Sequence, residues 1–163
     1  MPESIDFARL WDVVTKQYHG DIHYSPHGPA HWQRVERNGL LLASRTGADP
    51  VVVRLFALFH DSRRLNESTD EGHGKRGADF AAQLRGSLYE LDDDAFELLI
   101  EACTWHTDRD FSENCTIGTC WDADRLDLGR VGIIPDAALM STVFGKEIAR
   151  CGSIYPFLKT EPS

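Results

Sequence analysis

The longest apolar run in the chain predicts a helix that lies at the centre of the fold. Residues 51–61 read VVVRLFALFHD, and Arg54 is the one charged residue before the run ends on His60-Asp61. A helix that is apolar on nearly all sides is expected to be covered by other helices. Two polar side chains at its buried end need partners there. From adjacent positions, an imidazole and a carboxylate can converge on one point, as the ligands of a metal do. The stretch therefore predicts a buried helix with a metal site just beyond its C-terminal end.

Helical spacing of apolar residues recurs along the rest of the chain and predicts an all-α fold. A loop rich in Gly, Pro and His, residues 19–29, follows the first helix, which Ser4 is expected to cap. A second loop, residues 62–77, is expected to be mobile through its glycines at 72, 74 and 77, and it runs into the start of the next helix. Beyond residue 129, one short helix near 141–150 is expected. The predicted helices are 5–18, 30–45, the central 51–61, 75–85, 92–106 with an acidic cap, and 116–128.

Composition and charge place limits on the class of protein. A chain of 163 residues with 42% hydrophobic and 26% charged residues is typical of one globular domain. The net charge of −9 argues against nucleic acid or an anionic membrane as the main partner. No segment has the length of a membrane span, and the first ten residues lack the features of a secretion signal. We therefore expect a cytoplasmic protein.

The four cysteines do not indicate a disulfide framework. They form no CxxC pair, and their number is low for a chain of this length. Cys103 and Cys120 fall within apolar helical patterns, which favours buried free thiols over a zinc–thiolate site.

Four predicted helices each carry a polar group on an inward face. These groups are His31, the His60-Asp61 pair, His106 and a carboxylate in residues 121–130, WDADRLDLGR. In that last helix, Asp124 lies on the apolar face, where a carboxylate needs a partner. Asp122 and Asp127 are expected to pair with Arg125, Arg130 or backbone groups. Asp124 is therefore the ligand candidate of the three aspartates.

The ordered set HWQRV, FHDSRR and ADRLD resembles the HD-domain superfamily of metal-dependent phosphohydrolases. The resemblance covers about residues 20–130 of a single domain expected to span 1–163, with a less regular C-terminal tail. It implies an HD-domain-like helical bundle in which His31, His60, Asp61 and Asp124 bind a divalent metal, commonly Mn, Mg, Co, Ni or Fe. A mixed His and carboxylate set suits such ions.

Relatives with two metals place further histidines between the His-Asp doublet and the final Asp. His73 and His106 lie in that interval and are the candidates for a second ion. His106 ends a buried helical face, whereas His73 reads equally well as an ordinary residue at a helix start. His27 reads as a loop residue or as a donor to a ligand.

Arg64 stands three residues after Asp61, where branches of the superfamily often hold a catalytic Glu or Lys. An arginine can bind a phosphate through two nitrogens but is a poor general base. The proton is then left to a metal-bound hydroxide or to Asp61. Arg63, Lys75 and Arg76 are further cations expected at the rim of the site.

The function that the resemblance implies is hydrolysis of a small phosphoester or nucleotide. Two alternatives stay open: a di-iron oxygenase, because some HD-fold members activate O₂ with a similar ligand set, and a metal- or nucleotide-binding sensor without turnover. The oligomeric state is left open by the sequence.

Overall fold

A computed structural model describes residues 4–158; the two ends of the expected domain, residues 1–3 and 159–163, lie outside the described residues. The described part contains no β-strand, and the only bridge is the isolated pair Arg85 and Tyr89. The predicted all-α class is therefore confirmed. The helices are α1 Phe7–Lys16, α2 Pro29–Thr46, α3 Pro50–Phe59, α4 His73–Leu84, α5 Asp93–Trp105, α6 Cys115–Arg125, α7 Val143–Arg150 and α8 Tyr155–Leu158, with short 3₁₀ helices η1 Leu128–Val131 and η2 Ala137–Leu139.

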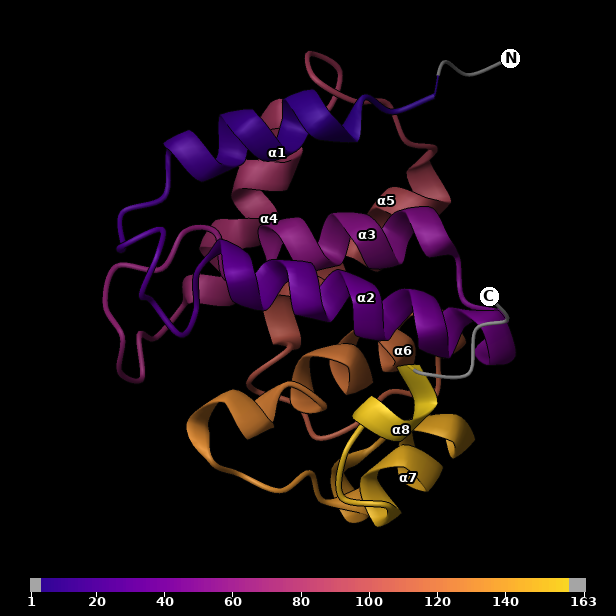
Figure 1. The fold of residues 1–163 in the computed structure, drawn as a ribbon. Coiled ribbons are helices and arrows are strands. Elements are labelled where there is room, and N and C mark those ends of the chain that lie inside the picture. Colours follow the sequence, from indigo (N-terminus) through magenta and orange to yellow (C-terminus); the bar gives the residue numbers. More distant parts are fainter. Residues whose placement is uncertain (1–3, 159–163) are drawn as a thin grey trace.

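Helix α3 lies at the centre of the bundle, as its sequence predicts. Figure 1 shows it beside α2, with α1 on one side of the pair and the α6 to α8 region on the other. Residues 52, 53 and 55–59 are all buried. The Asp49 side chain accepts a hydrogen bond from Val51 N, and Pro50 occupies the first turn, so the helix starts where the sequence indicates. It ends at Phe59, which places His60 and Asp61 directly beyond its last turn.

Arg54 is the charged residue that interrupts this apolar helix, and it lies at the edge of the core. Its Nε is 3.3 Å from Glu36 Oε2 on α2, and its guanidinium lies 3.7 Å from the centroid of the Phe7 ring. The side chain is about one-third exposed. The charge therefore reaches solvent between α1 and α2 and does not need a buried counterion.

Helix α4 begins at His73, two residues before the predicted start, and its glycines have a packing role that contradicts the expected mobile loop. Gly74 and Gly77 are both buried. A Cβ at Gly74 would meet Cys103 O at the end of α5, and one at Gly77 would meet Phe59 O at the end of α3. The absent side chains let α4 approach the C-terminal ends of two helices, which brings His73 into the interior.

Other helix boundaries differ from the predicted ones because side-chain caps decide them. Asp6, not Ser4, caps α1, through a hydrogen bond from Arg9 N to Asp6 Oδ1. Helix α6 ends at Arg125, before the predicted 128, and the chain turns into η1. The predicted short helix near 141–150 is α7, but η2 and α8 were not expected.

The buried interior includes the two thiols that the pattern indicated. Cys103 and Cys120 are buried free cysteines, whereas Cys115 and Cys151 are exposed. Burial raises the pKa of both buried thiols. Within residues 4–158, no helix combines the length and the hydropathy that crossing a bilayer requires.

We predict that Gly39→Ala destabilises the bundle. Gly39 is buried on α2, and an added Cβ would meet Val53 Cγ1 on α3. Overpacking costs about 1–3 kcal/mol, against roughly 1 kcal/mol gained when Ala replaces Gly within a helix. Chemical denaturation should therefore show a net loss in the free energy of unfolding.

Gly129→Ala is the matched control, because a Cβ there meets nothing within 4 Å. Its free energy of unfolding should stay close to that of the wild type. A Gly39→Ala protein as stable as this control would show that α2 and α3 can separate without cost.

Candidate metal centre

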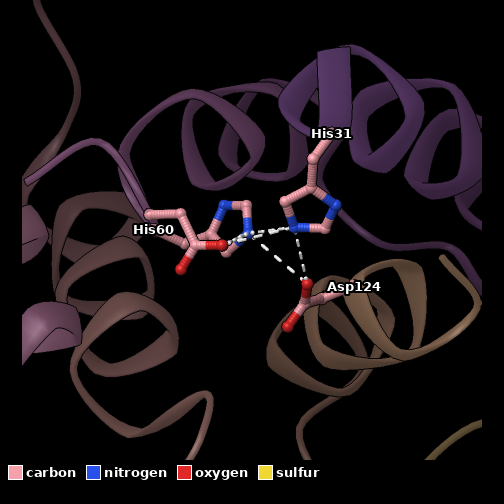
Figure 2. A group of neighbouring side chains, drawn as sticks. His31, His60 and Asp124 are labelled. Atoms are coloured by element: carbon pink, nitrogen blue, oxygen red, sulfur yellow. Dashed lines mark hydrogen bonds and ion pairs between the residues drawn. The ribbon is translucent and has the colours of Figure 1, made fainter. Parts of the chain in front are cut away.

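Six side chains from five parts of the chain converge at one end of α3, and we call them the candidate metal centre. Helix α2 supplies one histidine, the residues just after α3 supply a histidine and an aspartate, and the start of α4, the end of α5 and the last turn of α6 supply one residue each. The six residues are His31, His60, Asp61, His73, His106 and Asp124. Figure 2 shows His31, His60 and Asp124 pointing toward one another.

The first half of the centre joins His31 and His60 to two carboxylates. The two Nε2 atoms are 3.1 Å apart. Asp124 Oδ1 lies 3.0 Å from His31 Nε2 and 3.4 Å from His60 Nε2. Asp61 Oδ2 lies 3.3 Å and 3.5 Å from the same two nitrogens. Four potential ligand atoms therefore surround one point.

The second half of the centre uses the other oxygen of Asp61. His73 Nε2 and His106 Nε2 are 3.0 Å apart. Asp61 Oδ1 lies 3.2 Å from His73 Nε2 and 3.4 Å from His106 Nε2. Asp61 thus directs one oxygen to each histidine pair, as a carboxylate that bridges two ions does. The structure brings His73 and His106 to the same centre as the other four candidates.

Each histidine of the centre has its second ring nitrogen occupied by an acceptor. His31 Nδ1 lies 2.7 Å from Asp127 Oδ2, His73 Nδ1 2.8 Å from Asp70 O and His106 Nδ1 2.7 Å from Cys103 O. His60 Nδ1 lies 3.0 Å from both Phe56 O and Ala57 O. A proton on each Nδ1 leaves the Nε2 lone pair facing the centre, which is the arrangement of metal-ligating histidines.

The pKa shifts of the buried side chains in the centre favour a bound positive charge. Burial alone would lower the pKa of His31, but contacts with Asp124, Asp127 and Asp61 raise the pKa to about 10. Burial works against ionisation of the two aspartates, yet the surrounding histidines hold the pKa of Asp61 and of Asp124 well below the usual range. Both carboxylates are therefore anionic and draw a cation to the centre, either a proton or a metal ion.

The donor set fits divalent metal ions. Ligand nitrogens at about 2.0–2.1 Å from one ion and at right angles lie about 3 Å apart, close to the observed spacing within each histidine pair. Four imidazoles and two carboxylates are ligands that first-row dications accept. Residues His31, His60, Asp61 and Asp124 could hold one ion, and Asp61, His73 and His106 a second.

Asp127 and Asp70 support the centre and were not singled out by the sequence. Asp127 was expected to pair with arginine or backbone; it does contact Arg130, at 3.8 Å, but its Oδ2 also holds His31 Nδ1. Asp70 has a left-handed backbone, with φ of 43°. Its side chain accepts hydrogen bonds from Leu65 N and Arg76 Nη2, and its carbonyl faces His73. In the sequence, only the three-residue spacing from Asp124 to Asp127 could have indicated that Asp127 lies near the candidate metal centre.

Asp122 and Asp124 have different partners, as the facial argument expected. Asp122 is fully buried. It accepts hydrogen bonds from Ser141 N, Thr142 N and Thr142 Oγ1, which ties α6 to the segment before α7. Burial raises the pKa of Asp122, and these hydrogen bonds oppose the shift only in part. Burial on its own does not mark the ligand, since Asp124 is the more exposed of the two.

The four cations expected at the rim have separate positions. The Arg64 side chain is buried, with Nε 3.4 Å from Asp61 Oδ1 and Nη1 bonded to Asn66 O and Ser68 O. Lys75 pairs with Asp79 at the exposed surface. Arg63 lies over the Phe80 ring, and Arg76 binds Asp70. Arg64 is the one of the four with a contact to a candidate ligand in the described part of the chain.

His27 faces the centre from the loop before α2. Its Nδ1 lies 3.7 Å from Asp61 Oδ2 and has no hydrogen-bond partner among the described residues. The side chains of His27 and Asp124 are 16% and 19% exposed, whereas those of the other five ligand candidates are at most 4% exposed. The centre is therefore open to solvent mainly beside these two residues.

Comparison with known proteins supports the fold. No family model and no curated protein matches the sequence. The structure is similar to the crystal structure of a predicted HD superfamily hydrolase from an uncultured Thermotogales bacterium, with a TM-score of 0.71 and 24% sequence identity. The similarity covers 94% of this chain and 87% of that chain. It confirms the expected HD-domain-like helical fold.

We predict that Asp124→Asn loses metal and Asp122→Asn keeps it. Asp124 is within reach of two ligand histidines, whereas Asp122 faces backbone groups. Elemental analysis of the purified variants after dialysis tests this. Circular dichroism checks that both variants fold, because an asparagine amide at position 122 would face the donors of Ser141 or Thr142. An empty centre in Asp122→Asn beside a full one in Asp124→Asn would exclude the assignment.

We predict close to two metal ions per chain. The two histidine pairs share Asp61, so each oxygen of that carboxylate would serve one ion. His106→Ala should lower the stoichiometry toward one, because it removes a ligand of the second group alone. A wild-type ratio of one ion, unchanged in His106→Ala, would assign His73 and His106 to structure or substrate contact.

Proposed function

We propose that this chain belongs to the HD superfamily and is a metal-dependent phosphohydrolase that acts on a small phosphoester or nucleotide. The observation that supports the proposal most is the position of Asp61, whose two oxygens face two separate histidine pairs. The similarity in fold to a predicted HD superfamily hydrolase supports it further. Divalent ions bound there would polarise a phosphoryl oxygen and acidify a water molecule.

The charges of the centre suit an anionic substrate although the chain as a whole is acidic. Two dications would outweigh the charges of Asp61 and Asp124, leaving local positive charge. A phosphoryl group would approach from the side of Asp124 and His27, the more exposed side chains around the centre. The unpartnered Nδ1 of His27 would bind an oxygen of that group or the attacking water.

Arg64 would stabilise charge on the phosphoryl oxygens. Its Nε and Nη1 are engaged with Asp61 and loop carbonyls, and its Nη2 makes no hydrogen bond to a described residue. These contacts fix the guanidinium beside Asp61 before substrate binds, and a donor held in place is worth most where charge develops. Asp61 was the side-chain candidate for accepting the proton of the attacking water, but its lowered pKa and its two engaged oxygens suit it better to holding the ions.

A di-iron oxygenase is the second candidate, because the same four histidines and two carboxylates are suitable iron ligands. The discriminating experiment loads the protein with Mn²⁺, Co²⁺ or Fe²⁺ and supplies a panel of phosphorylated metabolites. Release of phosphate with Mn²⁺ or Co²⁺ supports the hydrolase. A mixed-valent EPR signal with iron, together with no phosphate release, would favour the oxygenase. Full metal content with neither activity would indicate a sensor.

We predict that Arg64→Ala lowers kcat/KM by about 10²–10³, the scale for losing one preorganised donor. Arg64→Lys should recover only part of the activity, since lysine keeps the charge but lacks the planar pair of donors. The measurement uses the phosphoester with the highest activity in the panel. Metal content, by elemental analysis, should stay unchanged in both variants.

Because Arg64 also fixes residues 66–68, thermal unfolding of both variants accompanies the kinetics. Lys75→Ala is the control, since Lys75 is an exposed cation that pairs only with Asp79. Full activity in Arg64→Ala would show that the arginine fixes the loop and has no part in the reaction.

A further inference from the structure

A cavity lies between α2, the segment around η1 and the start of α8, apart from the candidate metal centre. Its volume is about 530 Å³, within the range of small-molecule sites. Three arginines from two segments line it, Arg34 and Arg37 on α2 and Arg130 in η1. We call it the arginine cavity. Such a concentration of guanidinium groups is unexpected in a chain with a net charge of −9.

The arginines have more donors than the protein satisfies. Asp127 is the one carboxylate in the lining, and it accepts a hydrogen bond from Arg34 Nε at 2.8 Å. Arg37 bonds only to the amide oxygen of its neighbour Asn38. Arg130 bonds to Pro26 O and Asp127 O. Four terminal nitrogens therefore lack hydrogen bonds to described residues: both of Arg34, Nη1 of Arg37 and Nη2 of Arg130.

The remaining charge favours an anion. Asp127 is shared between His31 and Arg34, so one carboxylate does not neutralise three guanidinium groups. Arginines bind phosphate with paired, charge-assisted hydrogen bonds. The open nitrogens of the cavity thus suit a phosphate or a diphosphate group.

Apolar side chains form another part of the cavity wall. Ile133, Ile134 and Tyr155 line it and are 51%, 75% and 59% exposed. The Arg37 guanidinium lies 5.5 Å from the centroid of the Tyr155 ring. An aromatic ring beside arginines offers a stacking surface next to an anion site. The ligand that fits both parts of the wall carries a phosphate and an apolar or aromatic group.

The arginine cavity is separate from the candidate metal centre. None of the six residues of the centre lines it. Asp127 contacts His31 through Nδ1, on the side of the ring away from Nε2 and the other ligands. A ligand in the cavity therefore lies behind His31 and does not reach the centre.

We propose that the arginine cavity is a second ligand site, which binds an organic phosphate with an aromatic group, such as a nucleoside diphosphate. The proposal does not depend on hydrolysis at the candidate metal centre. Binding of ADP to the metal-loaded protein, followed by isothermal titration calorimetry, tests it. Adenosine and inorganic pyrophosphate, which each carry one half of the expected ligand, should bind at least tenfold more weakly.

Arg37→Gln should weaken ADP binding about tenfold or more and leave the metal content unchanged, because Arg37 contacts neither Asp127 nor a ligand of the centre. Arg9→Gln, a change of an exposed arginine on α1, is the matched control and should bind as the wild type does. Asp124→Asn disables the metal centre and should still bind ADP at the cavity.

Three results would overturn the proposal. The first is ADP affinity in Arg37→Gln equal to that of Arg9→Gln. The second is loss of ADP binding in Asp124→Asn, which would place the nucleotide at the metal centre. The third is equal affinity for ADP and pyrophosphate, which would show that the apolar side chains of the cavity do not contribute to binding. The second result would support a nucleotide as ligand of the metal centre, whereas the first and third leave the proposed hydrolysis untouched.

Discussion

The structure depends on one buried carboxylate, Asp61, placed beyond the end of the most apolar helix in the chain. A carboxylate is costly to bury, and the protein offsets that cost with four histidines and Arg64. Helices α2, α4 and α5 must each end or pass near this point to supply a histidine. The helices that pack around α3 are therefore the same helices that bring the histidines to Asp61.

Much of the fold was predictable because the apolar spacing and the capping residues of each segment indicated the same helices. The central helix, its Asp49 cap and the class of the fold follow from apolar spacing and capping residues. The position of His31, His60 and Asp61 at helix ends follows from the same signals. The pairing of Asp122 with backbone and the inward position of Asp124 followed from helix faces. These features depend on residues near one another in sequence.

The remainder depends on contacts between distant segments. The start of α4 at His73 depends on Cys103 O and Phe59 O, which lie in other helices. Asp127 reaches His31 across 96 positions of sequence. The arginine cavity joins α2 to the region after residue 125, most of which lies in the tail where the sequence indicated little structure. Spacing within one helix carries no information about such contacts.

The approach of α4 has a consequence for comparing proteins of this kind by their ligand residues. Gly74 supplies no ligand atom, yet a single methyl group there would meet Cys103 O and displace the helix that carries His73. A relative with all six candidate ligands but alanine at this position would hold the histidine away from Asp61. The number of bound ions therefore cannot be inferred from the ligand residues alone. It also depends on how closely the backbone of α4 can approach the end of α5.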